Sequence, residues 1–290
     1  MPTLTVSGHA IHFTDSGSPP GSVPGSAAAG GAGTAAGAPV IALHSGGLSS
    51  RQWSKLAALL APRHRVLAPD FTGSGGSSPW PAGAPYHHSV EVEVTLALLA
   101  TLDGPVHLVG HSFGGLVALR AALGAPARVL SLGLFEPVAF GLLHEAGGTE
   151  LPGYQSDMDL FGSAGAAPGG EVWLRRFIDW WQGAGAWDAL PPPAKAQFLA
   201  VGPKVCLEVS SLTTDRLAAK DLASLDMPAL VLRSERSPLA ARRTCELLAH
   251  ALPRGRLQQL DGTGHLAPVT HAAAVNALLA EHLEASERPR

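Results

Sequence analysis

The sequence predicts an α/β fold, in which a mostly parallel, doubly wound sheet carries an inserted helical lid. Three observations lead to this prediction. Short apolar runs recur between turn residues, as is typical of strands buried on both faces of a sheet. Helical patterns separate most of these runs, and strand alternating with helix indicates right-handed crossovers. The interval 137–226 breaks the alternation, and it is far too long for a loop inside a compact domain.

The expected elements follow one another along the chain. A hairpin is expected from Leu4–Val6 and Ile11–Phe13, which flank the turn residues Ser7-Gly8. Six further strands are expected at Val40–Leu43, Arg65–Ala68, Val106–Val109, Ser131–Phe135, Ala229–Leu232 and Arg256–Leu260. Helices are expected between or after them at Arg51–Leu60, Val90–Leu102, Gly115–Leu123, Ala240–Ala251 and Ala272–Leu283. Residues 1–136 and 227–290 are therefore expected to form the core.

Residues 137–226 predict a mostly helical lid, with helical patterns at Glu171–Gln182 and Pro193–Ala200. This interval contains nine of the 16 aromatic residues: Phe140, Tyr154, Phe161, Trp173, Phe177, Trp180, Trp181, Trp187 and Phe198. Most of them are expected to form the lid's own small core. A few should line an apolar cavity beneath it, and the candidate substrate contacts are Phe140, Trp180, Trp181 and Leu266.

Glycine and proline account for 34 and 24 positions, and one tract concentrates them without charged residues. Gly17–Ala38 consists of Gly, Ser, Pro and Ala with one Val and one Thr, so it predicts a flexible loop with no assigned function.

Composition excludes several classes of protein. A net charge of −3 without a basic cluster predicts neither nucleic-acid nor membrane-surface binding. The start of the chain lacks the basic and apolar regions of a signal peptide, and no run reaches the roughly 18 apolar residues of a membrane span. A cytoplasmic location is expected, and the oligomeric state is left open. Cys206 and Cys245 are expected to be free, buried thiols.

The strongest chemical signal is Gly110-His111-Ser112-Phe113-Gly114-Gly115, which directly follows the expected strand Val106–Val109. A G-x-S-x-G motif between a strand and a helix predicts a nucleophile elbow, a strained turn that exposes the serine hydroxyl. The motif alone is weak in a glycine-rich chain, and its strand–turn–helix context makes it specific.

A nucleophilic serine needs a base and an oxyanion hole. His265 is the best placed of the 13 histidines, because it follows the last expected strand and precedes the last helix. Gly46, after the strand Val40–Leu43, and Phe113, at the start of the helix after Ser112, are the expected backbone donors. His87-His88 is expected to be a solvated pair, and no histidine spacing indicates a zinc site. No metal or cofactor is expected.

With these residues, the chain resembles the α/β-hydrolase superfamily over residues 39–285. His44-Ser45-Gly46-Gly47 resembles the family's oxyanion loop, with Ser45 in place of the usual Gly, and Asp70-x-x-Gly73-x-Gly75 resembles its turn. The resemblance implies a nucleophile–acid–base order along the chain, with Ser112 and His265 as nucleophile and base. It also implies hydrolysis of an ester, amide or related bond. Asp70 and Asp261 are expected to stabilise turns.

The chain departs from the family at the acid, because Ser237 occupies the position of the usual Asp after the seventh strand. Glu136, at the end of the sixth strand, is the preferred substitute, since haloalkane dehalogenases and some other relatives place their acid there. Glu235, two residues before Ser237, is the alternative, and a bare Ser–His pair or a water-assisted variant is a third possibility.

The expected activity is that of a carboxylesterase for a small lipophilic or aromatic ester, through a Ser112–His265–Glu136 triad and an acyl-enzyme. The same groups would serve a lactone hydrolase or a carbon–carbon bond hydrolase, and a non-catalytic ligand-binding member of the fold is a further alternative. Dehalogenases and epoxide hydrolases of this fold are set aside because they use an Asp nucleophile.

Overall fold

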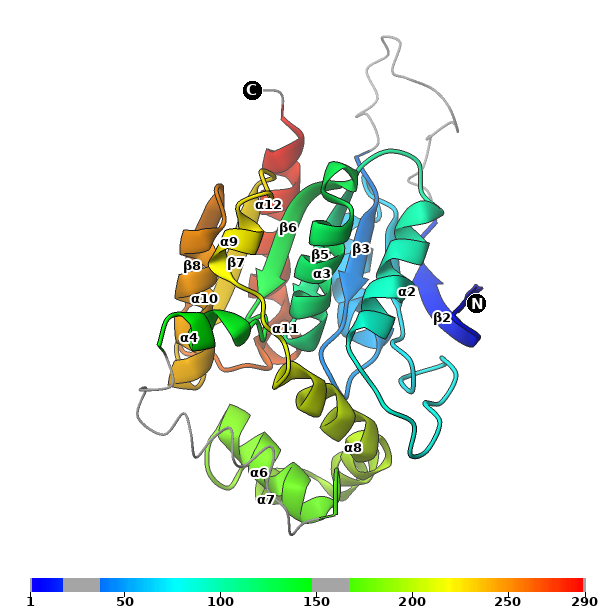
Figure 1. The fold of residues 1–290 in the computed structure, drawn as a ribbon, viewed down its shortest axis with the longest axis vertical. Helices are drawn as coiled ribbons and strands as arrows, with labels where there is room; N and C mark the ends of the chain where they lie inside the picture. Colours follow the sequence, from blue (N-terminus) through cyan, green and yellow to red (C-terminus); the bar gives the residue numbers. More distant parts are fainter. Residues whose placement is uncertain (1, 18–36, 148–166, 289–290) are drawn as a thin grey trace.

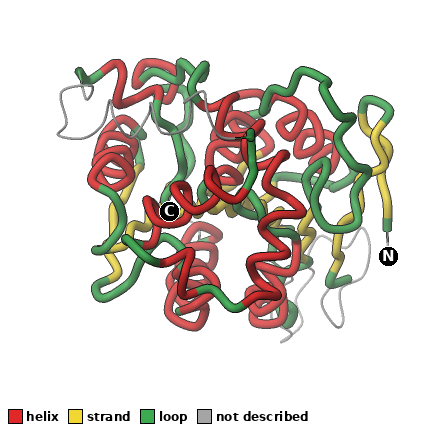
Figure 2. The backbone as a smooth tube through the Cα atoms, turned by 90° about the horizontal axis from the view of Figure 1, so that it is seen from below, coloured by secondary structure: helices red, strands yellow, loops and turns green. Residues whose placement is uncertain are grey.

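The computed structural model describes residues 2–17, 37–147 and 167–288, and it centres on an eight-stranded sheet (Figure 1). The strands are β1 Thr3–Val6, β2 His9–Asp15, β3 Val40–Leu43, β4 Val66–Pro69, β5 Val106–His111, β6 Val129–Phe135, β7 Ala229–Ser234 and β8 Gly255–Leu260. Their spatial order is β1-β2-β4-β3-β5-β6-β7-β8. The N-terminal hairpin is antiparallel and lies at one edge (Figure 2), while the six strands β3 to β8 run parallel to one another. The predicted α/β fold class is confirmed.

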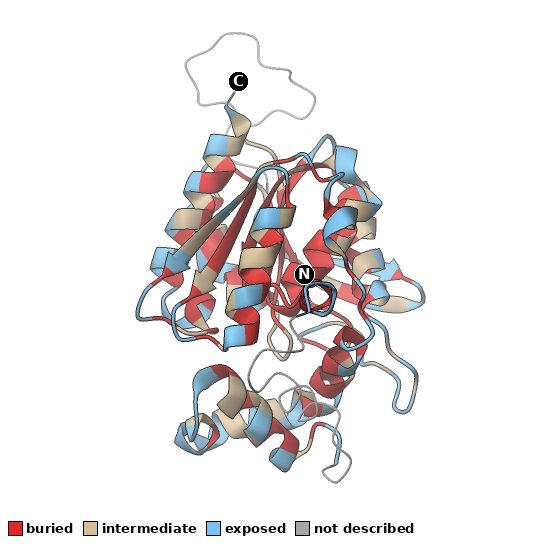
Figure 3. Cartoon of the chain, turned by 60° about the vertical axis from the view of Figure 1, so that its left-hand side comes forward, coloured by how far each residue is buried: buried red, intermediate tan, exposed pale blue. Residues whose placement is uncertain are grey.

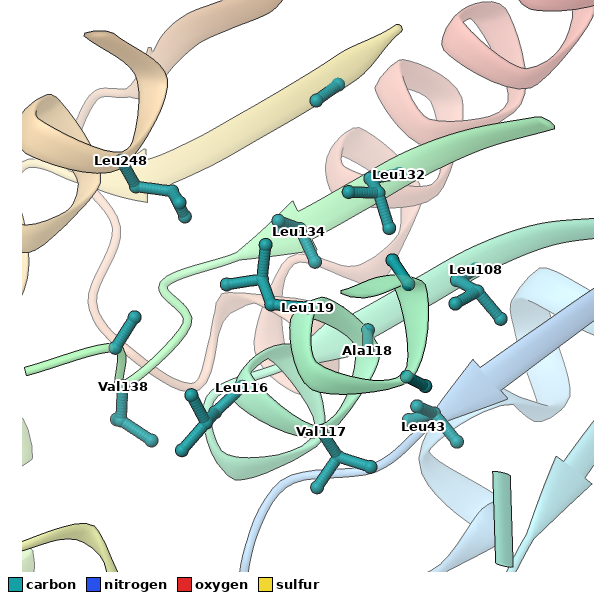
Figure 4. Packing of buried hydrophobic residues seen from close by; sticks show 14 of the residues in the cluster. Leu43, Leu108, Leu116, Val117, Ala118, Leu119, Leu132, Leu134, Val138 and Leu248 are labelled. Carbon is teal, nitrogen blue, oxygen red and sulfur yellow. The ribbon is translucent and has the colours of Figure 1, made fainter. Parts of the chain in front are cut away.

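Helices cover both faces of the sheet because the strands alternate their side chains between two apolar layers. Ile41 and Leu43 of β3 point into one layer, which α2 Ser89–Ala100, α3 Phe113–Gly124 and α10 Leu239–Ala251 cover. Figure 4 shows the leucines of α3 packed against those of β5 and β6 in this layer. Val40 and Ala42 point into the other layer, beneath α1 Ser54–Leu60 and α12 Ala272–Glu287. The central strands are buried throughout (Figure 3).

The remaining described helices are short or belong to the interval 137–226. They are η1 Ser50–Trp53, η2 Pro126–Arg128, α4 Gly141–Glu145, α6 Glu171–Gln182, α7 Ala186–Ala189, α8 Pro192–Leu212, α9 Ala219–Leu222 and α11 Ala267–Thr270. In Figure 1, α6, α7 and α8 form a group beyond the end of the sheet to which β6 points. Among its described residues the interval contains no strand.

Helix α8 is longer than the sequence predicts, since the predicted helix ends at Ala200 and the observed one continues to Leu212. Gly202-Pro203 indicates a helix end, but burial overrides this local signal. Beyond Pro203, Val205 and Val209 pack against Trp173 and Trp187 in a separate apolar cluster. The expectation that several aromatic residues form a core within 137–226 agrees with this packing.

Two sequence expectations fall on segments with little or no description. Most of the predicted loop Gly17–Ala38 lies outside the described residues, as do Tyr154 and Phe161.

None of the described helices combines the length and the apolar character that crossing a lipid bilayer requires.

Candidate active site

Ser112 occupies the sharp turn between β5 and α3 with φ 54° and ψ −116°, a conformation that is costly for a residue with a side chain. The neighbouring glycines make this turn possible. A Cβ at Gly110 would lie 2.4 Å from the carbonyl oxygen of Gly114, and a Cβ at Gly114 would lie 2.4 Å from that of Leu43. The motif therefore forms the predicted strand–turn–helix arrangement, with no space for larger residues at either position.

The structure brings together three residues that are far apart in the sequence. Nε2 of His265 lies 3.0 Å from Oγ of Ser112, and Nδ1 of His265 lies 2.7 Å from Oε2 of Glu136. All three side chains are buried. When Nδ1–H donates to the carboxylate, Nε2 carries the lone pair that can accept the hydroxyl proton. This geometry is that of a nucleophile, a base and an orienting acid.

Glu136 is fixed by the end of the neighbouring strand β7. The backbone N–H of Ser234 donates to Oε1 at 2.7 Å, and the hydroxyl of Ser237 donates to Oε2 at 2.8 Å. Ser237, which stands where the family usually has an Asp, therefore contacts the carboxylate that reaches His265. Because β6 and β7 pair side by side in parallel, their carboxyl ends lie within reach of the same histidine.

The alternative acid, Glu235, lies elsewhere in the same turn. Its side chain is exposed, and Oε2 accepts the backbone N–H of Gly262 at 2.7 Å. The geometry therefore favours Glu136 as the partner of His265.

The proposed oxyanion donors border one cavity together with Ser112 and His265. The N–H of Phe113 opens α3 and therefore lies outside the helix's own hydrogen bonds. Buried His44 holds the loop that carries Gly46: its Nδ1–H donates to the carbonyl of Ser45 at 2.7 Å, and its Nε2 accepts the N–H of Phe71 at 3.0 Å. Burial lowers the pKa of His44 to about 4, so the ring is neutral near pH 7.

A chain of hydrogen bonds that no sequence motif indicates links this loop to His265. The side-chain amide of Gln52 accepts the N–H of Ser45 at 3.0 Å and donates to Nδ1 of His111 at 3.1 Å. Nε2–H of His111 then donates to the carbonyl of His265 at 3.0 Å. Burial lowers the pKa of His111 well below its ordinary value, which keeps this ring neutral. Gln52 carries no motif that could have identified it.

The cavity has a volume of about 340 Å³ and a mainly apolar lining from the sheet ends and from 137–226. Three of the four predicted substrate contacts, Phe140, Trp181 and Leu266, line it. The Trp181 ring stacks on the imidazole of His265, with centroids 3.5 Å apart and planes 17° apart.

Trp180 is the exception, because it is not among the residues that line this cavity. Successive residues on a helix point in different directions, and Trp180 instead packs edge-on against Trp181 with ring centroids 4.5 Å apart.

The histidine pair also requires a correction. His88 is buried, not solvated, and its Nε2 lies 3.2 Å from Oδ2 of Asp215, which Arg120 also binds at 2.6 Å. The charged partners were not recognisable from the local sequence, because Asp215 lies more than 100 residues further along the chain.

Asp70 follows β4 and stabilises the turn after it, as predicted, and Asp261 lies in the turn that follows β8. Asp70 accepts the N–H groups of Ser50 at 2.7 Å and Gly76 at 2.8 Å, while Asp261 accepts the side chain of Gln259 at 2.8 Å.

The two cysteines are free and buried, as predicted.

One group in the described part of the chain has the ligand types of a metal site. His64, His107 and Glu287 place one ligand atom each within 4.8 Å of one another. Nδ1 of His64 is hydrogen-bonded to the carbonyl of Ala38, and Glu287 accepts the N–H of the same residue. His107 lies near the start of β5, whereas Ser112 follows its end, so this group is remote from the serine.

Comparison with known proteins identifies the family. A family model described as "Alpha/beta hydrolase family" matches residues 40–278, which run from β3 into α12. The chain belongs to this family. Within the α/β hydrolases, it is 30% identical over 258 residues to a putative carbamate hydrolase RutD of Pseudomonas savastanoi pv. phaseolicola, covering 86% of this chain and 95% of that protein.

Two further matches illustrate the range of relatives. Lipase LipV of Mycobacterium tuberculosis is 41% identical over 106 residues, which are 36% of this chain and only 39% of that lipase. The structure of a putative lipase from Acinetobacter baumannii AYE shares the fold with a TM-score of 0.73 at 18% identity, covering 99% of this chain and 91% of that one.

Proposed function

We propose that the protein is a serine hydrolase and that it acts as a carboxylesterase on small lipophilic or aromatic esters. The observation that carries this proposal is the hydrogen-bonded series from Ser112 through His265 to Glu136 beside an apolar cavity. Membership of the α/β hydrolase family supports the hydrolytic class.

In the proposed mechanism, Oγ of Ser112 attacks the ester carbonyl while Nε2 of His265 accepts its proton. The resulting imidazolium donates Nδ1–H to Glu136, which stabilises its positive charge. The backbone N–H groups of Gly46 and Phe113 bind the oxyanion, and one such donor typically contributes about 10²- to 10³-fold in kcat. His265 returns the proton to the leaving alcohol, and water then releases the acyl group by the same steps in reverse order.

We further propose that residues 137–226 act as the lid that selects the substrate, over a core of 1–136 and 227–290. Its helices supply most of the apolar lining, and Trp181 covers one face of the His265 ring. A 340 Å³ cavity is at the lower end of the range for small-molecule sites. This size favours a compact ester over a polymer.

Labelling with a fluorophosphonate probe tests the nucleophile. The wild-type protein should be labelled, whereas Ser112→Ala should not. The control Ser210→Ala, which removes a serine hydroxyl from α8, should be labelled like the wild-type protein. Absence of labelling in folded wild-type protein would favour a non-catalytic ligand binder, and labelling that survives Ser112→Ala would refute the assignment of the nucleophile.

The bond cleaved is tested with a substrate panel, because lactones and the carbon–carbon bond of a ring-cleavage diketone need the same three groups. The name of one relative adds a carbamate to the panel. p-Nitrophenyl esters of graded acyl length should give the highest kcat/KM, with short acyl chains preferred. A higher value for a lactone, a diketone or a carbamate would replace the ester assignment.

A further inference from the structure

Glu208 is a buried acid in the cavity that the proposed mechanism does not use. It lies on α8, lines the cavity and is 2% exposed. Its Oε1 accepts a hydrogen bond from Nζ of Lys204 at 2.8 Å. Its Oε2 is also buried, and it has no hydrogen-bond partner in the described part of the chain. A buried acceptor without a partner is costly, so this oxygen requires an explanation.

The unpartnered oxygen faces the loop that carries the proposed oxyanion donor. A Cβ built on Gly46 would lie only 2.6 Å from Oε2 of Glu208 and 3.9 Å from Cβ of Phe113. Gly46 thus leaves the space that the carboxylate occupies. A substrate whose carbonyl oxygen is bound at Gly46 would hold its neighbouring atoms close to this oxygen.

The charges around Glu208 do not balance. Lys204 is the ammonium shared by Glu208 and Glu91, whose Oε1 lies 3.3 Å from Nζ. Glu91 is also buried, and it accepts further hydrogen bonds from Tyr86 at 3.0 Å and from the N–H of Thr72 at 3.1 Å. Two buried carboxylates therefore face one cation. Burial raises the pKa of Glu208, Lys204 opposes this effect, and the charge of Glu91 raises the pKa again, so the net shift is upward. A cation beside Oε2 would lower this pKa and hold the carboxylate in its ionised form.

We propose that Glu208 is a binding site for a protonated amino group next to the scissile carbonyl of the substrate. This inference rests on the proposed esterase function. It narrows the substrates to esters of α-amino acids. An ammonium supplies both the missing donor and the missing positive charge. A hydroxyl supplies only the donor, and a methyl group supplies neither.

The same geometry has the opposite effect on esters without a cation. In its ionised form, a carboxylate beside the oxyanion loop repels the negative charge that develops on the carbonyl oxygen, and this form slows the reaction of a neutral ester. Removing the charge should therefore improve neutral esters while it impairs amino esters. This inversion distinguishes a recognition role from general damage to the site.

Three benzyl esters of nearly equal size test the proposal: those of 2-methylpropanoic acid, lactic acid and alanine, which carry CH₃, OH and NH₃⁺ at one position. Release of benzyl alcohol gives kcat/KM for each ester. In the wild-type protein, we expect the alanine ester to exceed the 2-methylpropanoate about ten- to hundredfold, as for a hydrogen bond to a charged group. We expect the lactate ester to lie between them.

Glu208→Gln keeps the shape and removes the charge. It should lower kcat/KM for the alanine ester at least about tenfold and raise it for the 2-methylpropanoate. The control is Asp188→Asn on the neighbouring helix α7, which removes one negative charge from the exposed surface and should leave the ratio unchanged. Equal ratios in wild-type protein and Glu208→Gln would overturn the proposal, and a preference for lactate over alanine would overturn the assignment of a cation.

Binding to Ser112→Ala separates this inference from the esterase proposal, because it needs no turnover. Calorimetry should show tighter binding of the alanine ester than of the 2-methylpropanoate, and Glu208→Gln in the same background should abolish the difference. If this binding is found but the wild-type protein hydrolyses none of the three esters, the esterase proposal is refuted and the amine site is retained. Hydrolysis of all three esters without any dependence on Glu208 would refute the amine site alone.

Discussion

Replacing Glu136 by Gln should invert the hydrogen bond on which the base depends. The N–H of Ser234 already donates to Oε1 at 2.7 Å, so the amide oxygen of the Gln has to remain there. Its NH₂ group then faces Nδ1 of His265 and the hydroxyl of Ser237. An NH₂ group can only donate, so Nδ1 has to accept and the ring proton moves to Nε2. In this tautomer, Nε2 cannot take the proton of Ser112.

The magnitude follows from this change of tautomer. The equivalent substitution in a Ser–His–Asp enzyme costs about 10⁴-fold in kcat, which corresponds to about 5 kcal/mol in the activation free energy. We expect a loss of that order for Glu136→Gln. The fold should survive, because Ser237 can turn its hydroxyl to accept from the amide and no charge is left buried without a partner.

The assay is kcat for p-nitrophenyl butyrate, with thermal unfolding to verify the fold. Glu235→Gln is the matched control, and it should retain most of the activity because Glu235 is exposed and bound to Gly262. Adding Ser237→Asp to Glu136→Gln should restore part of kcat by placing a carboxylate at the neighbouring strand end. Retention of more than about a tenth of kcat in Glu136→Gln, against the 10⁴-fold loss, would refute the reasoning, as would an equal loss in Glu235→Gln.

Three further predictions concern the support of the site. Gly114→Ala would place a Cβ 2.4 Å from the carbonyl oxygen of Leu43. It should therefore lower the free energy of unfolding by about 1–3 kcal/mol and abolish fluorophosphonate labelling. An unchanged melting temperature would contradict this prediction. Ser237→Ala removes the 2.8 Å hydrogen bond to Glu136. It should lower the free energy of unfolding by about 1.5–3 kcal/mol and reduce kcat severalfold. A variant that loses neither stability nor activity would show that this bond is dispensable. The pKa of His44 is about 4 in the folded protein and about 6.5 in an unfolded chain. Between these pH values the unfolded state binds more protons, so the free energy of unfolding falls as the pH drops from about 6.5. The loss amounts to roughly 3 kcal/mol at pH 4. Urea unfolding from pH 7 to pH 4 should show a weaker pH dependence in His44→Asn, and equal dependences in the two proteins would contradict the assignment.

The sequence was sufficient for features that local chemistry determines. The strands β3 to β8 and the turn around Ser112 follow from apolar runs and from glycines that sit where any side chain would clash. The place of Glu136 at the end of β6, together with the resemblance to relatives that carry their acid there, favoured it for contact with His265, because carboxyl ends of parallel strands converge at one edge.

Features that depend on distant contacts were not accessible from the sequence. Gln52 lies within an expected helix and Glu208 lies beyond the expected end of another. Only the folded chain shows one joined to His111 and the other opposite Gly46. The continuation of α8 past Pro203 depends on tertiary packing that no local rule describes.

The contact between Glu136 and Ser237 suggests how a catalytic acid can change its place during evolution. A single substitution to Asp at position 237 would set a second carboxylate beside the first, and two carboxyl groups so close share one proton. Such an ancestor would keep one ionised oxygen next to His265 and would remain active. Loss of either acid would then leave a working enzyme, so lineages with the acid after β6 and lineages with the acid after β7 can descend from one chain without an inactive intermediate.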